Sequence, residues 1–103
     1  MTDTDEYVED EVSVEATPPR RIRFEPIEWN NKPFDSMVLR EPTGGQLVEV
    51  RKVQDPIAQA LKLIQLNSGL PMQVVHMLPQ KVIEAAGAYF EGFSPASPEN
   101  GKA

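Results

Sequence analysis

The alternation of apolar and polar residues near the start of the chain predicts a β-hairpin. The segment RIRFEPIEW places apolar side chains at every second position, which is the period of a half-buried strand. Pro26 interrupts this alternation, which then resumes one residue out of phase and predicts a β-bulge or an edge position, because proline cannot donate to a ladder. Asn30 and Asn31 tolerate positive φ and predict the turn. We therefore expect an antiparallel hairpin over residues 21–40.

After the hairpin, apolar residues recur at intervals of three or four, which predicts short helices. Thr43 and Gln46 have the spacing of a capping box, so Thr43 is expected to cap the first helix. Asp55 and Pro56 supply the cap and the first-turn proline of the second helix, and Gly69 ends that helix. The expected helices cover residues of about 44–53, 56–67, 71–77 and 79–92.

Two of these helices are amphipathic, because their apolar residues lie on one side of the helix. We expect this side to face the core of the domain. In the second helix the expected inner face consists of Ile57, Ala60, Leu61 and Ile64. In the last helix it consists of Val82, Ile83, Ala86, Phe90 and Phe93.

The stretch LREPTGGQL joins the hairpin to the first helix and contains two adjacent glycines. Glycine pairs at a strand-to-helix turn also cradle phosphates in nucleotide-binding loops. The lysine, the serine or threonine and the further glycines of such loops are missing here, so we interpret the stretch as architectural. Its structural motif residues are Leu39, Arg40, Pro42, Thr43 and Gln46.

Together these elements predict an α+β fold that is mostly helical, with an N-terminal β-hairpin followed by three or four short helices. They fit one small domain over residues 20–93 of the 103-residue chain. Residues 1–19 contain seven acidic residues, no basic residue and two adjacent prolines at their end, which predicts a disordered acidic tail. The stretch SPASPENGKA, residues 94–103, predicts a second flexible tail.

The formal net charge of -6 comes from the acidic tail, because charges in the rest of the chain nearly balance. The absence of cysteine excludes a disulfide framework and a thiolate zinc site. The amino terminus is acidic, and no apolar run approaches the roughly 20 residues that a membrane span needs. We therefore expect a soluble, intracellular protein without a membrane partner.

No arrangement of residues predicts catalysis, a cofactor or a metal site. His76 is the only histidine and lies in the apolar segment VVHML, where a structural role is favoured over that of a general base. Glu84 and Glu91 lie two turns apart on the last helix, so we interpret them as solvating that helix rather than as an acid and base pair. The expectation is a protein that is not an enzyme.

Two short basic groups stand out against the acidic tail, Arg51-Lys52 and Arg20-Arg21-Arg23. Nucleic-acid binding by these groups would have to overcome the repulsion between phosphates and the seven tail carboxylates. We therefore interpret both groups as solvated faces and expect no nucleic-acid partner.

A surplus of soft apolar residues between positions 63 and 78 exceeds what one side of two short helices can bury. Methionine and leucine surfaces suit the adaptable binding of apolar helices, because their side chains repack at little cost. For any single one of them, the alternative that it fills the core is favoured. The candidate binding face consists of Leu63, Leu66, Leu70, Met72, Val75 and Met77.

The order of these segments resembles that of the phage tail assembly chaperones of contractile-tailed phages, the Mu-like group, over residues 24–93. The most specific piece is the run LREPTG, where the family has Leu-Arg-x-Pro-Thr leading into a helix. The closing YFEGF matches more loosely. The sequence departs from the family at Gln46, where an acidic residue is expected, and at Pro79-Gln80, where an aspartate tends to start the last helix. Both departures concern helix caps.

The resemblance implies a small protein of the host bacterial cytoplasm that binds the long, largely helical tape measure protein as its client. It further implies that the chaperone keeps this client soluble and competent for assembly until the tail tube forms, and that it then leaves. A longer frameshifted form of the chain is a second implied partner. A homo-oligomer stays open.

An alternative of another class also stays open, namely an acidic regulatory or antitoxin-like protein whose N-terminal tail occupies a basic site on its partner. Deletion of residues 1–19 separates the two hypotheses. Binding that survives the deletion and is lost when Leu66, Met72 and Met77 become charged favours the chaperone. The reverse result favours the regulator.

Overall fold

The structure is a computed structural model, and it describes residues 11–93. Residues 11–19 belong to the predicted acidic tail, residues 1–19; they form no helix or strand and are exposed. Residues 1–10 and the predicted second tail, residues 94–103, lie outside the described residues. Within residues 11–93, the first regular element therefore begins at Arg20.

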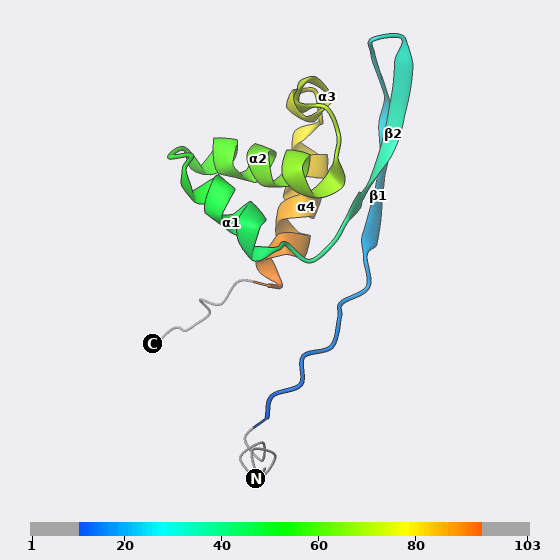
Figure 1. Cartoon of the computed structure of the whole chain (residues 1–103). Helices are drawn as coiled ribbons and strands as arrows, with labels where there is room; N and C mark the ends of the chain where they lie inside the picture. The colour runs from blue at the N-terminus through cyan, green and yellow to red at the C-terminus, as the bar shows by residue number, and fades with distance from the viewer. Residues whose placement is uncertain (1–10, 94–103) are drawn as a thin grey trace.

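An antiparallel hairpin opens the folded part of the chain (Figure 1). β1 covers Arg20–Trp29 and β2 covers Lys32–Leu39. The turn between them holds Asn30 at φ 58° and Asn31 at φ 63°, in the left-handed region that asparagine tolerates better than most residues. The predicted hairpin and its Asn-Asn turn are confirmed.

The pairing of the two strands shifts where the alternation of the sequence breaks. Between Arg23 and Ile27, β1 has two more residues than the facing stretch of β2. Pro26 lies in this extra segment, where its missing N–H leaves no gap in the ladder. The predicted bulge is confirmed, and it allows apolar residues on both sides of it to pack against the core.

Four helices follow within the described part of the chain, and Figure 1 shows them together on one side of the hairpin. They are α1 Gly44–Arg51, α2 Pro56–Ser68, α3 Met72–His76 and α4 Gln80–Glu91. The predicted fold class, a mostly helical α+β fold with an N-terminal hairpin, is confirmed. The turn between α1 and α2 lies at the end of the helical layer that is farthest from the hairpin (Figure 1), so fewer elements cover that end.

The stretch LREPTGGQL turns the chain out of β2 and caps α1. The Thr43 hydroxyl accepts from the backbone N–H of Gln46 at 3.2 Å, and the Gln46 side chain accepts from the backbone N–H of Thr43 at 3.3 Å. This reciprocal pair is the predicted capping box, with Thr43 as N-cap. Gly44 and Gly45 are the first two residues of the helix.

Asn67 of α2 ties the same stretch to the helical layer. Its side-chain amide bonds both the N–H and the C=O of Arg40, at 2.7 and 2.9 Å, and it donates to Oε1 of Gln46 at 3.0 Å. Nε2 of Gln46 in turn donates to the carbonyl of Leu66 at 3.4 Å. A glutamate would lack this donor, which gives a physical reason for glutamine at a position where the resemblance leads one to expect an acidic residue.

We expect Thr43→Ala to lower the free energy of unfolding by about 1 kcal/mol, because it removes the acceptor for the Gln46 N–H at the start of α1. Urea denaturation followed by circular dichroism measures this loss. Glu41→Ala, at an exposed neighbouring position outside the capping box, is the control and should change stability less. Equal losses in the two variants would contradict the capping role.

The core lies between the hairpin and the helices. Burial of apolar side chains there stabilises the fold by roughly 25 cal/mol for each Å² removed from water. Both strands contribute to it, since partly buried residues of β1 pack against the buried residues of β2 and of the helices. The buried residues are Met37, Leu39, Ile64, Leu70, Val74, Val75, Leu78, Ala86 and Tyr89.

One residue expected on the inner face of α2 lies outside. Ile64 is buried, and Ala60 and Leu61 are half-buried, but the Ile57 side chain is 69% exposed. Ile57 belongs to the first turn of α2, at the end of the helical layer farthest from the hairpin (Figure 1). The expectation that Ile57 faces the core is therefore wrong, because no strand reaches that end of the helix.

The last helix buries a residue outside the inner face that its apolar periodicity predicts. The buried residues of α4 are Ala86 and Tyr89, and the other residues expected on that face are half-buried. The Tyr89 hydroxyl donates to the carbonyl of Pro18 at 3.2 Å. The Arg20 guanidinium lies over the Tyr89 ring, 5.4 Å from its centroid. Tyr89 thus holds the start of the hairpin against α4.

Candidate functional site

The six residues of the candidate binding face do not form one exposed surface. Leu70 and Val75 are buried in the core, so these two cannot belong to an exposed face. Val75 is buried because α3, which has only five residues, contacts both α2 and β1. Leu70 lies between α2 and α3 and belongs to the same buried cluster. Met77 is 52% exposed. The half-buried members of the face are Leu63, Leu66 and Met72.

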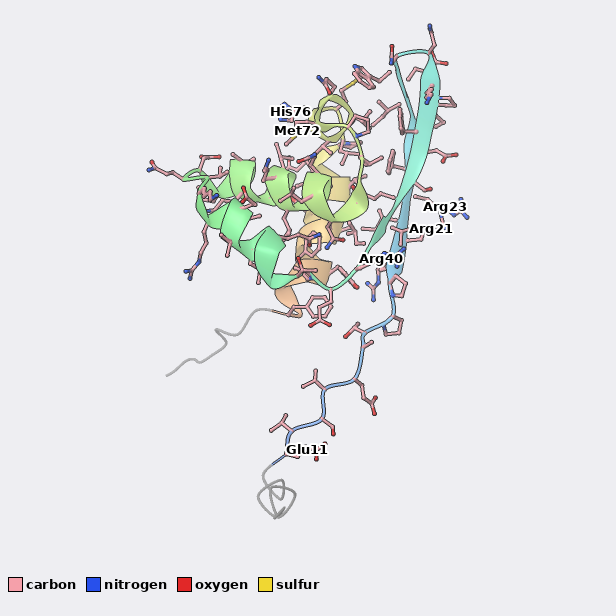
Figure 2. All side chains as sticks on the ribbon, in the orientation of Figure 1. Glu11, Arg21, Arg23, Arg40, Met72 and His76 are labelled. Atoms are coloured by element: carbon pink, nitrogen blue, oxygen red, sulfur yellow. The ribbon has the colours of Figure 1, made fainter. Side chains whose placement is uncertain are left out.

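A groove of about 330 Å³ lies between α2 and α3, and we call it the α2–α3 groove. Its lining is mostly apolar. Met72, a member of the candidate binding face, lines it from α3 together with His76; both are labelled in Figure 2. The full lining is Val53, Asp55, Ile57, Ala58, Leu61, Lys62, Met72 and His76.

Local interactions hold the α2 side of this groove in place. The Asp55 carboxylate caps α2 by accepting from the backbone N–H of Ala58 at 2.9 Å. The Gln59 side chain donates to the carbonyl of Val53 at 2.5 Å, which fixes the turn between α1 and α2. The exposed Ile57 is thereby presented from a regular first helical turn rather than from a loop.

A second groove, of about 420 Å³, lies along a neighbouring face of α2, and we call it the α2–α4 groove. Leu63 is the member of the candidate binding face that lines it. The full lining is Val50, Pro56, Gln59, Ala60, Leu63, Gly87, Phe90 and Glu91. α2 thus presents apolar side chains to two grooves, one on each of two faces of the helix.

Exposed apolar side chains extend beyond the two grooves. On the helical layer the large ones are Leu47 and Val48 of α1, Ile57 of α2 and Met77 after α3. Among these four, Ile57 is the one that lines either of the two grooves. Contiguous apolar surface marks interaction sites more often than isolated exposed residues do, and Ile57 is contiguous with the apolar lining of the α2–α3 groove.

The sequence pattern does not identify Val53, Ile57 and Leu61 as groove residues. Helical periodicity shows that a helix has an apolar side, but it does not show how much of that side another element covers. The available signal was the width of the apolar arc on α2, where Ile57 and Leu61 form one row and Ala60 and Leu63 form the next. The surface that α2 packs against the core is too narrow to cover both rows along the whole length of the helix.

The arrangement is suited to holding apolar side chains. Asp55, Lys62 and His76 are the ionisable groups of the α2–α3 groove, and the remaining lining residues are aliphatic or thioether side chains. Within residues 11–93, no three His, Cys, Asp or Glu side chains group in a way that could hold a metal ion. None of the helices in this part of the chain has the length and apolar character to cross a membrane.

A family model described as phage tail assembly chaperone proteins, E, or 41 or 14, matches residues 24–95. The matched stretch runs from within β1 to beyond the end of α4 and covers more than half of the chain. It contains the capping box and every residue that lines the two grooves. Comparisons with curated proteins and with solved structures give no match.

Proposed function

Because this chain belongs to the phage tail assembly chaperone family, we propose that it binds apolar helical segments of a tape measure protein in the grooves beside α2. The bound client stays soluble and competent for assembly until the tail tube forms around it. The chaperone acts in the host bacterial cytoplasm and leaves before the tail is complete.

The observation that supports this proposal most strongly is Ile57, 69% exposed beside the apolar α2–α3 groove. A side chain of this size contributes roughly 1.5–3 kcal/mol when a partner removes it from water. Met72 in the same groove adapts to differing client side chains, because its thioether chain has several rotatable bonds. A few such contacts exceed the free-energy cost of association by a small margin, so the client is held reversibly.

A helical client suits this surface because α2 already presents its apolar side chains at helical spacing. An amphipathic client helix carries apolar groups three and four residues apart and can lay them in a groove between two helices. A long, largely helical client offers many such stretches. The acidic residues before β1 add net negative charge, which keeps a protein with exposed apolar surface in solution.

Co-expression with the tape measure protein of the same genome tests the proposal. We expect the tape measure protein to appear in the soluble fraction together with this chain, and in the insoluble fraction when an unrelated acidic protein replaces it. A tape measure protein that is equally soluble in both cases, or insoluble in both, would argue against the proposed role.

A further inference from the structure

The outer face of the hairpin carries two arginines close together. Arg21 and Arg23 are exposed and alternate along β1 with the half-buried Ile22 and Phe24. We call these two exposed residues the arginine face. Nη1 of Arg21 donates to the Ser36 hydroxyl at 3.3 Å. The structure pairs neither arginine with a carboxylate of residues 11–93.

The segment that precedes β1 carries acidic residues, whose charge is complementary to that of the arginine face. Residues 11–16, EVSVEA, place Glu11 and Glu15 at alternate positions from Val12 and Val14, which is the period of a strand. Val12 is 80% exposed and Val14 is 81% exposed. One side of the extended segment is therefore acidic, and the other side is apolar and uncovered.

The segment leads away from the arginine face of its own chain. Pro18 and Pro19 restrict the backbone to extended conformations and restrict the residue before them in the same way. The hydrogen bond from the Tyr89 hydroxyl to the Pro18 carbonyl holds this exit direction. Figure 2 shows Glu11 beyond the end of the hairpin, far from the labelled arginines.

We infer that two copies of the chain exchange these segments, so that residues 11–16 of one copy add as an antiparallel strand along β1 of the other. Within the described sheet β1 has one strand neighbour, β2, and its other edge has no strand beside it. Strand addition to such an edge is a common mode of recognition, because backbone hydrogen bonds supply affinity and alternate side chains supply specificity.

One register of the added strand pairs its acidic side with the arginines of β1 and its apolar side with the apolar residues of β1. It places Glu15 opposite Arg21 and Val14 opposite Ile22, so that an ion pair forms on the outer side and an apolar pair on the inner side. A shift by one residue would set valines against arginines and is therefore disfavoured. The next two pairs in the matching register are Ser13 with Arg23 and Val12 with Phe24.

The same register makes the contact reciprocal. Its two-fold axis passes beside Pro18, so each copy gives a segment and receives one, as a closed dimer requires. The prolines at the centre add no ladder hydrogen bond, and the exchanged segments on either side supply the pairing. The contact lies on the hairpin, whereas Met72 and His76 mark the α2–α3 groove on the helical layer (Figure 2).

Sedimentation velocity of the full chain over a wide range of concentrations tests this inference. We expect a monomer–dimer equilibrium that weakens as salt is added. A dimer contains two contacts between residues 15 and 21, and either Arg21→Glu or Glu15→Arg places like charges at both of them. Each substitution should therefore weaken dimerisation about tenfold. Arg51→Glu, the same charge change on α1, is the control and should leave the dimer unchanged.

An equimolar mixture of the Arg21→Glu and Glu15→Arg chains separates exchange between copies from a contact within one chain. The mixed dimer restores both pairs of opposite charge, so the mixture should dimerise about as tightly as the wild type. A wild-type chain that is monomeric at every concentration, single variants that dimerise as well as the wild type, or a mixture no tighter than its components would each overturn the inference. These variants leave both grooves intact, so client binding reports separately on the proposed function.

Discussion

Ile57→Asp is expected to weaken binding of a tape measure helix by about 10- to 100-fold. The substitution removes roughly 1.5–3 kcal/mol of apolar burial, and each 1.4 kcal/mol is about a factor of ten in Kd. The new carboxylate also loses hydration when the client covers it. The fold should persist, because Ile57 is exposed and an aspartate in the first turn of α2 complements the helix dipole. Calorimetric titration with a helical client peptide measures the change.

Val48→Asp is the matched control for this prediction. Val48 is 56% exposed on α1, and it lines neither the α2–α3 groove nor the α2–α4 groove. Client affinity should stay within about twofold of the wild type, the effect of a surface change of roughly 0.5 kcal/mol. Equal effects of the two substitutions would show that any exposed apolar residue serves, and the groove would lose its assigned role.

Leu39→Ala should lower the free energy of unfolding by about 2–5 kcal/mol, the loss seen when a buried leucine leaves a cavity. Leu39 is 0% exposed at the end of β2, and the hydrogen bonds between Asn67 and the backbone of Arg40 keep the adjoining chain from moving in. A small domain has a total stability of about 5–15 kcal/mol, so this loss is a large share of it.

Leu47→Ala is the control for Leu39→Ala, because it makes the same chemical change at a half-exposed position of α1. Its loss should be under about 1 kcal/mol, because little apolar surface is buried there. Urea denaturation of both variants gives the comparison. Similar midpoints for the two would mean that Leu39 is not part of the core.

The caps and turns of this fold follow from sequence because they depend on residues that are close in the chain. The capping box needs a hydroxyl at Thr43 and a side-chain amide three residues later, and both hydrogen bonds form. The turn needs two residues that accept positive φ, and Asn30 and Asn31 both do so. The bulge follows from Pro26 by the same local logic. These features made the fold class predictable.

The candidate binding surface depends on which elements meet in space, and for that reason the sequence predicted it less well. Val75 and Ile57 are both aliphatic residues of short helices, but α2 and β1 cover the helix that carries Val75, and the first turn of α2 stays open. The burial of Tyr89 could not be predicted for the same reason, since its hydrogen-bond partner Pro18 lies 71 residues away in the chain. Periodicity shows which side of a helix is apolar, but it does not show which other element covers that side.

The family was predicted from the run LREPTG and the order of the elements, and the match over residues 24–95 confirms it. A chaperone family also agrees with the expectation that the chain is not an enzyme. Membership of the Mu-like group and the identity of the client stay predictions. Leu63, Leu66, Met72 and Met77 likewise remain candidates for client binding.

Methyl NMR of the labelled chain, titrated with a helical peptide from the tape measure protein, tests whether a client helix occupies the α2–α3 groove. We expect the methyl signals of Ile57, Leu61 and Met72 to shift together as the peptide is added, while that of Val38 on the hairpin stays in place. Peptide binding that leaves the three groove signals unchanged would contradict this expectation.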